Sequence, residues 1–99
     1  KEDNNDALKK LKKYLSLIPD HKADKHFIQT IVIYGAYNSI GQPAYEIVEN
    51  WYRKTNNYLK SPQYVIEVFS KGADRNGYTL KSIYNIPEVK EALRMELFK

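Results

Sequence analysis

The stretch that decides the fold is residues 51–86, WYRKTNNYLKSPQYVIEVFSKGADRNGYTLKSIYNI. Cap and turn residues divide it into segments: Ser61-Pro62 is a typical helix start, Gly72 a typical helix end, and Thr79 the cap of a further helix. Trp51 and the residues after it indicate the end of a preceding helix. The stretch therefore predicts helices joined by short polar connections. Aromatic and basic residues alternate along it, and none of them forms a pattern typical of a catalytic centre.

The segments on either side have the same helical period. Leu8, Leu11 and Leu15 are spaced to line one face of a first helix, which Pro19 ends. Near the other end of the chain, Pro87 begins a last helix. The apolar residues of this last helix are spaced four apart, at Val89, Leu93 and Leu97.

A second helix is predicted to begin near Asp24 and to end at Gly41. Its run of β-branched residues at 31–33 has β propensity, but the chain offers no alternating segments with which a strand would pair. Helix is therefore favoured, and Gly35 is expected to weaken its end. The residues expected on its buried side are Phe27, Ile28, Ile31, Val32 and Ala36.

A third helix is predicted to begin at Pro43 and to carry Trp51 on its apolar face. We expect the indole of Trp51 to lie in the core rather than to act as a stacking platform. Its expected neighbours are Phe27, Ile31 and Phe69. The prediction for residues 1–99 is thus an all-α fold, a compact bundle of five to six short helices in a single domain.

Length and composition limit the possible classes of protein. Ninety-nine residues make one domain with one core. The absence of Cys excludes disulfides, thiolate metal sites and cysteine nucleophiles, and it fits a reducing compartment, so a cytoplasmic location is expected. No apolar run approaches the ~20 residues of a membrane span, so no membrane partner is expected. Because the chain opens on Lys1 and its helical pattern continues to Lys99, we expect a fragment of a longer protein.

No sequence motif predicts an enzyme. The chain has no phosphate-binding loop, no dinucleotide fingerprint and no nucleophile elbow. His21 and His26 are five residues apart, which is not the spacing of two metal ligands on one helix face, so solvated histidines are favoured over a metal site. Glu46 and Glu49 are interpreted as part of a solvated helix face. We therefore predict no catalytic residue, no metal site and no cofactor in this domain.

Basic and aromatic residues give the clearest indication of function. The net charge of +4 and the pI near 9.2 favour an anionic partner. Cations neutralise phosphates, and exposed tyrosines stack on unpaired bases at ~1–3 kcal/mol each. If the ends of the third and fifth helices share a side, the charges form one patch for a single strand. The residues predicted to bind nucleic acid are Arg53, Lys54, Tyr58, Lys60, Lys71, Arg75, Asn76 and Lys81.

Four elements within residues 27–86 carry a resemblance to a known module. They are Trp51, the run Tyr58-Leu59-Lys60-Ser61-Pro62, the run Phe69-Ser70-Lys71-Gly72, and the run from Gly77-Tyr78-Thr79 to Tyr84. With these elements the chain resembles the helical-bundle domain that follows the polymerase core in primase–polymerases of archaeal plasmids, viruses and mobile elements, often called the primase C-terminal domain. The basic first helix, at residues 9–13, has no clear counterpart in this pattern.

The resemblance implies a role in recognising single-stranded template DNA during primer initiation. The catalytic carboxylates would then belong to an adjacent primase–polymerase domain, and ATP or another nucleotide becomes a conceivable ligand of the bundle. A second hypothesis, from another class, is a protein-interaction adaptor that docks its basic first helix onto an acidic partner. A concave patch that joins Arg53, Lys71 and Arg75 favours DNA, whereas an exposed apolar groove without converging charge favours a protein partner.

Overall fold

The computed structural model describes residues 4–71 and 77–96. In chain order its elements are α1 (Asn4–Ser16), α2 (Asp20–Ala23), α3 (His26–Ser39), the 3-10 helix η1 (Gln42–Ala44), α4 (Tyr45–Tyr52), α5 (Asn57–Lys60), α6 (Tyr64–Lys71), α7 (Leu80–Tyr84) and α8 (Pro87–Glu96). The described residues contain helices and no strand, which confirms the all-α prediction.

These described ranges hold eight α-helices rather than the five to six expected. The difference comes from α2 and α5, single-turn helices in segments that the sequence predicted to be loops. Both turns close on their own backbone: the amide of Ala23 bonds to the carbonyl of Pro19, and that of Ser61 to the carbonyl of Asn57. Neither turn has a hydrophobic period long enough to indicate a helix from the sequence.

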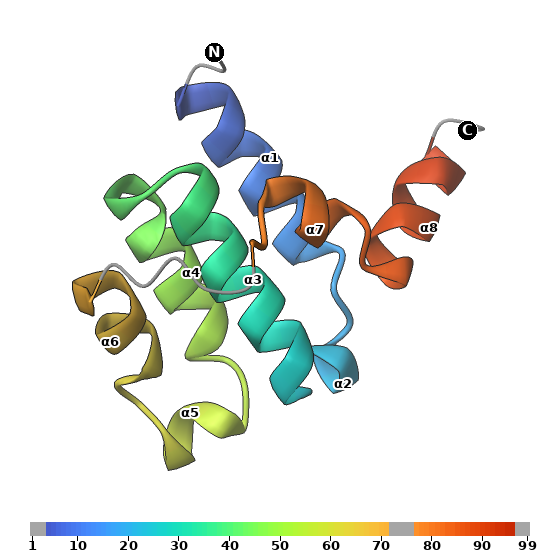
Figure 1. Cartoon of the computed structure of the whole chain (residues 1–99). Helices are drawn as coiled ribbons and strands as arrows, with labels where there is room; N and C mark the ends of the chain where they lie inside the picture. Colours follow the sequence, from blue (N-terminus) through green and yellow to red (C-terminus); the bar gives the residue numbers. More distant parts are fainter. Residues whose placement is uncertain (1–3, 72–76, 97–99) are drawn as a thin grey trace.

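The central element is α3, which passes through the middle of the bundle (Figure 1) and contacts α2, α4, α6 and α7. Because neighbours surround it, it is apolar on more than one side. Its buried apolar residues are Ile28, Val32, Ile33, Tyr34 and Ala36. The expectation that Phe27 is buried is wrong: its side chain is 61% exposed, at the first turn of the helix.

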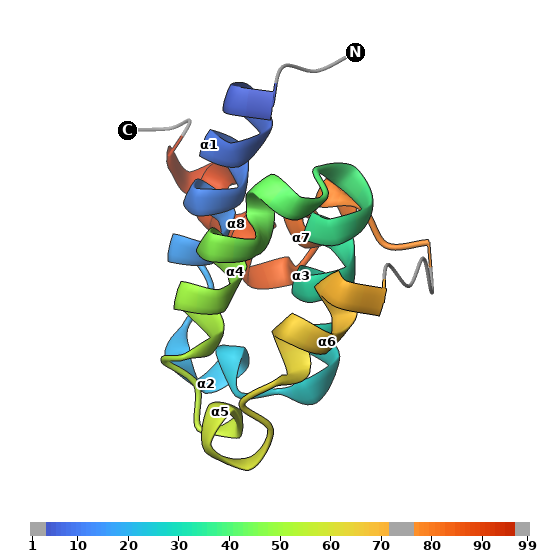
Figure 2. The ribbon, with the colours of Figure 1, turned by 90° about the vertical axis from the view of Figure 1, so that its left-hand side faces the viewer.

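Helices α4 and α6 lie side by side and run in opposite directions (Figures 1 and 2). Hydrogen bonds join the pair at both ends. Where α4 ends and α6 begins, the Tyr52 hydroxyl donates to the carbonyl oxygen of Ser61 at 2.9 Å. Where α6 ends, the Gln42 side chain donates to the carbonyl oxygen of Phe69 at 2.7 Å. The C-terminal ends of α4 and α6 therefore lie at opposite ends of the pair.

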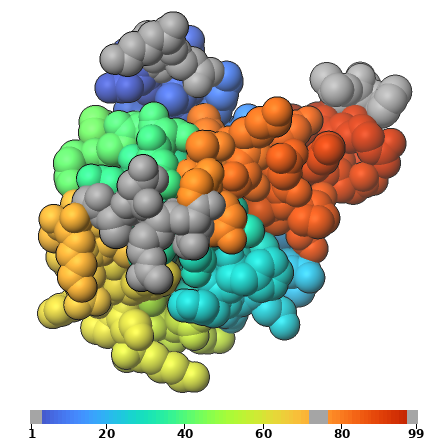
Figure 3. Space-filling view, viewed as in Figure 1, coloured from blue at the N-terminus to red at the C-terminus, as the bar shows by residue number. Residues whose placement is uncertain are grey.

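The start of α7 lies directly against α3, as the orange and green segments in Figure 3 show. A Cβ placed on Gly35 would lie 2.7 Å from the carbonyl oxygen of Thr79, so only glycine permits this approach. The amide of Leu80 donates to the Ser39 hydroxyl at 2.7 Å, and that of Thr79 to the Ser82 hydroxyl at 3.0 Å. The predicted helix start at Thr79 is confirmed, and Gly35, which lies inside α3, has a packing role there.

The fully buried aromatic residue of α4 is Tyr52, with 1% of its surface exposed. Trp51 is only partly buried and borders cavities lined by Leu15 and Ile18, on the side of α1 and α2. Phe69 instead packs edge-on against the rings of Tyr37 and Tyr45. The indole of Trp51 packs in part against the core, as expected, but it also borders an open cavity, and its expected neighbour Phe27 is exposed.

Candidate nucleic-acid interface

Four of the residues predicted to bind nucleic acid lie close together in the chain, where α4 ends and α5 follows: Arg53, Lys54, Tyr58 and Lys60. The guanidinium carbon of Arg53 lies 6.0 Å from the centre of the Tyr58 ring, within the range of a cation–π contact. The Tyr58 ring also meets the buried ring of Tyr52 edge-on, at 6.0 Å. Tyr58 is thus partly used in packing, whereas Lys54 and Lys60 are exposed.

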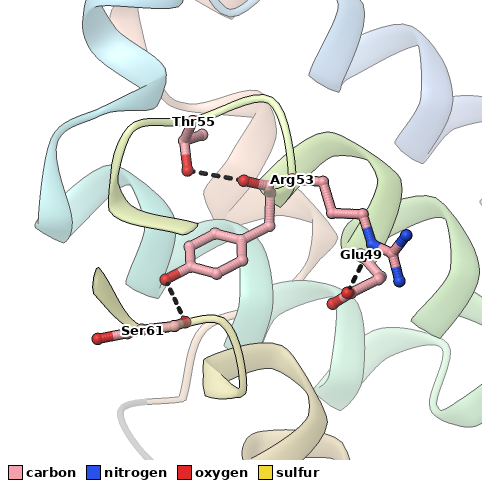
Figure 4. A network of polar contacts seen from close by, with 5 residues as sticks. Glu49, Arg53, Thr55 and Ser61 are labelled. Atoms are coloured by element: carbon pink, nitrogen blue, oxygen red, sulfur yellow. Dashed lines mark hydrogen bonds and ion pairs between the residues drawn. The ribbon is translucent and has the colours of Figure 1, made fainter. Parts of the chain in front are cut away.

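Arg53 is held by a buried carboxylate one helical turn earlier (Figure 4). Its Nε donates to Oε2 of Glu49 at 2.9 Å, and the Glu49 side chain is only 6% exposed. This hydrogen bond raises the pKa of Arg53 above its ordinary value. The other carboxylate oxygen, Oε1, is buried and has no hydrogen-bond partner among the described residues. The prediction that Glu49 lies on a solvated face is wrong, and Arg53 is its neutralising partner.

The turn after α4 is fixed by polar contacts around Tyr52 (Figure 4). The hydroxyl of Thr55, a buried residue, donates to the carbonyl oxygen of Tyr52 at 2.7 Å. Farther along, the Asn57 side chain donates to the carbonyl oxygen of Asp24 and to the buried side chain of Gln29, at 2.9 and 3.0 Å. These bonds attach α5 to the start of α3 and place Lys60 beside the start of α6.

The other predicted residues lie elsewhere. Lys71 ends α6, at the opposite end of the α4–α6 pair from Arg53. Lys81 lies on α7 and shares a cavity with Lys10 of α1. Arg75 and Asn76 lie outside the described residues. The described members of the predicted set therefore occupy three places, not the single patch that a shared side of the third and fifth helices requires.

Trp51 and Lys54 line a groove that the sequence did not predict. Two adjoining cavities, of about 370 and 270 Å³, share four lining residues, and we call them together the Trp51 groove. The shared residues are Leu15, Ser16, Trp51 and Lys54. Lys12 and Asn50 line only the smaller cavity, and Asp20, Asp24 and Asn56 line only the larger one. The groove is electrostatically asymmetric. Lys12 and Lys54 lie beside the indole, and the carboxylates of Asp20 and Asp24 lie at the far end.

The far end of the Trp51 groove is rigidly built. Asp24 accepts two hydrogen bonds from Asn56, one from its amide at 2.8 Å and one from its side chain at 2.9 Å. A carboxylate that accepts two hydrogen bonds is held in a fixed orientation. Asn50, on the surface of α4, is exposed at the other end.

A cavity of about 280 Å³ opens between α3, α5 and α6, and His26, Tyr64 and Lys60 are among the residues that line it. The rings of His26 and Tyr64 are stacked at 5.9 Å, with 18° between their planes. In residues 4–71 and 77–96, no three His, Cys, Asp or Glu side chains are grouped closely enough to hold a metal ion.

None of the described helices is both long enough and apolar enough to cross a bilayer. No protein-family model, curated protein or solved structure matches this chain.

Proposed function

We propose that this chain is a non-catalytic module that binds single-stranded DNA in the Trp51 groove. The observation that carries the proposal is the position of Trp51, partly exposed in two joined cavities and close to Lys12 and Lys54. As the resemblance implies, the module would belong to a replication primase and would hold template DNA for an adjacent polymerase domain.

The chemistry of the groove matches that of a nucleotide within a strand. The flat indole provides a stacking surface for an unpaired base, at ~1–3 kcal/mol, and stacking accepts any base because every base has a π face. Lys12 and Lys54 provide the positive charge for the phosphates beside that base. A strand lacking a complement is required, because bases inside a duplex are already stacked on one another.

The carboxylates of the groove give the strand a preferred side. Asp20 and Asp24 lie in the larger cavity, and phosphates placed beside them would be repelled. The backbone of a bound strand would therefore follow the end at which Lys12 and Lys54 lie. The exposed side chain of Asn50 is available at this end for hydrogen bonds to a base or a phosphate.

An adaptor that docks through an apolar surface is supported less well. Within residues 4–71 and 77–96, the large apolar side chains that are exposed are Phe27, Leu59, Ile66 and Met95. They belong to four different helices, α3, α5, α6 and α8, and none of them lines the Trp51 groove. Single exposed apolar residues of this kind are normal on a monomeric protein and do not indicate a docking surface.

The proposal is tested by titrating the chain into a labelled oligothymidylate at several salt concentrations, with fluorescence anisotropy as the readout. The Lys12→Gln/Lys54→Gln double variant should bind more weakly, and its salt slope should be smaller by about 1.4, since each phosphate contact contributes about 0.7 on a single strand. The matched control is Lys25→Gln/Lys90→Gln, which removes the same charge from exposed positions outside the groove.

Equal affinity of the two double variants would overturn the groove as the binding site. No binding by the parent chain, together with binding of an acidic polypeptide, would favour the adaptor instead. The primase context has its own test, which is the coding sequence upstream of Lys1. A polymerase domain with paired carboxylates there supports that context, and a different domain contradicts it.

A further inference from the structure

The exposed face of α1 carries a row of lysines, which we call the lysine ridge: Lys9, Lys10, Lys12 and Lys13. The opposite face of the helix is buried through Ala7, Leu11 and Leu15, so the four ammonium groups are confined to the solvent side. Within the described residues, Lys9 and Lys12 form no ion pair, and Lys13 pairs with Glu96 at 3.1 Å. That pair is between exposed side chains, and such pairs contribute little.

A second aromatic cavity flanks this ridge. Its volume is about 310 Å³, and it is lined by Lys10, Tyr14, Leu80, Lys81 and Tyr84, so we call it the Tyr84 cavity. The rings of Tyr14 and Tyr84 lie 5.9 Å apart, with 54° between their planes. Both tyrosines are partly buried, whereas Lys10 and Lys81 are exposed. Like the Trp51 groove, this cavity combines an aromatic surface with two lysines.

The two sites lie on opposite flanks of one helix. Lys12 and Ser16, one turn apart on α1, line the Trp51 groove, where α1 contacts α4. Lys10 and Tyr14, also one turn apart, line the Tyr84 cavity, where α1 contacts α7. Figure 2 shows α1 above both α4 and α7. Since a helix with its side chains is about 10–12 Å wide, the lysine ridge is the short path between the two sites.

We propose that one single strand of nucleic acid crosses α1, with its phosphates on the lysine ridge and unpaired bases in both the Trp51 groove and the Tyr84 cavity. This inference rests on the proposed function, to which it adds a second base site and a direction across the molecule. It assigns a binding role to α1, the segment that has no counterpart in the family pattern.

The packing of α7 explains why Lys81 does not lie beside Arg53. Lys81 belongs to α7, and α7 is held against α3 and α1 rather than against the end of α4. Its ammonium group therefore acts with Lys10 on the far side of the ridge. Two separated base sites joined by phosphate contacts bind a longer strand more tightly than a short one, because the second contact is intramolecular.

The test compares two ligands of equal length, an oligothymidylate and an abasic oligonucleotide that keeps the phosphates but has no bases. Tyr84→Leu should weaken oligothymidylate binding by about fivefold or more, which is the loss of one stacked base, and leave the abasic ligand unchanged. Lys81→Gln should weaken the binding of both ligands and reduce the salt slope by about 0.7. Lys90→Gln, an exposed charge on α8, is the matched control.

The outcomes separate this inference from the proposed function. If Tyr84→Leu and Lys81→Gln bind oligothymidylate as the parent does while Lys12→Gln/Lys54→Gln is impaired, the strand stops at the Trp51 groove and only the inference fails. If the parent binds no oligothymidylate, both fail. Displacement of the strand by polyglutamate at equal charge concentration would also overturn the inference, in favour of an acidic protein partner.

Circular dichroism and thermal unfolding check that each variant is folded. If Tyr84→Leu is unstable, Lys81→Gln, at an exposed position, tests the cavity instead.

Discussion

Trp51 and Tyr52 are neighbours on α4 and lie in opposite environments. Tyr52 is 1% exposed and its hydroxyl is bonded to the carbonyl oxygen of Ser61, whereas Trp51 remains partly exposed and lines the groove beside α1. One helix position therefore separates a fully buried residue that stabilises the fold from a partly exposed residue that lines an open groove.

We predict that Trp51→Leu separates binding from stability. Leucine keeps an apolar contact with the core but has no ring on which a base stacks, so oligothymidylate binding should weaken by about fivefold or more. Replacing the buried ring in Tyr52→Ala should cost about 3–5 kcal/mol of the unfolding free energy, and Trp51→Leu should cost clearly less. Urea unfolding and anisotropy titration measure the two effects. A Trp51→Leu variant that binds as tightly as the parent would show that the indole is only part of the core.

The hydroxyl of Tyr52 gives a second prediction. It lies 2.9 Å from the carbonyl oxygen of Ser61 and 3.3 Å from that of Asn57, and it connects α4 to the segment before α6. Tyr52→Phe removes this donor and keeps the ring, so the unfolding free energy should fall by about 1 kcal/mol. Denaturant unfolding measures the change, and an unchanged midpoint would mean that the hydroxyl contributes nothing.

The dependence of the unfolding free energy on alkaline pH should also report on Tyr52. Desolvation by burial, with smaller effects of Tyr64 and Glu49, raises the pKa of Tyr52 above its ordinary value. In the unfolded chain the phenol ionises near pH 10, while the folded chain still holds the proton. The stabilisation is therefore complete below about pH 10 and is lost as the pH rises toward the folded pKa.

The unfolding free energy of the parent should decrease as the pH rises above about 10, and that of Tyr52→Phe should decrease less steeply. Burial raises the pKa of Tyr45 as well, so some decrease should remain in the variant. Urea unfolding at a series of alkaline pH values measures both slopes. Identical slopes for the two proteins would argue against this role of Tyr52.

Helix boundaries were predictable where a single residue type sets them. Thr79 immediately precedes α7, and Pro87 begins α8. Gly41, which follows α3, has a φ of 90° that favours glycine. The exposure of Phe27 was not predictable, because α3 has neighbours on several sides and its sequence is apolar all round. Adjacent apolar residues such as Trp51 and Tyr52 likewise leave the rotation of a short helix undetermined.

The candidate site was less predictable than the fold. Basic and aromatic residues were recognised as the relevant types, but which of them meet depends on how the helices pack. The antiparallel pairing of α4 and α6 separates Arg53 from Lys71, and the contact of α7 with α1 brings Lys81 to Lys10. Sequence spacing carries no information on either arrangement, because both are made by residues far apart in the chain.

Gly35→Ala should destabilise the protein, although alanine is normally the better helix residue. Alanine in a helix gains about 0.5–1 kcal/mol over glycine. Here its Cβ would lie 2.7 Å from a backbone oxygen of Thr79, and overpacking of this kind costs about 1–3 kcal/mol. The clash should prevail, since backbone cannot rotate away as a side chain can. Thermal unfolding measures the result, and a variant more stable than the parent would show that α7 shifts freely.

A test of Arg53 requires a double variant, because this residue supports the fold and is also predicted to bind nucleic acid. Its guanidinium neutralises Glu49, whose side chain is 6% exposed. Arg53→Ala leaves that carboxylate buried without its partner, which is strongly unfavourable, so its melting temperature should fall more than that of Lys54→Ala, an exposed neighbour. Glu49→Gln removes the buried charge, so adding it to Arg53→Ala should recover part of the lost stability.

Binding is then measured in the Glu49→Gln background, where the loss of Arg53 no longer leaves a buried charge unpaired. Arg53 lines neither cavity of the Trp51 groove, whereas Lys12 and Lys54 both do. Arg53→Ala/Glu49→Gln should therefore weaken oligothymidylate binding less than Lys12→Gln/Lys54→Gln does. The opposite order, with the larger loss and the larger change in salt slope at Arg53, would place the strand at the junction of α4 and α5.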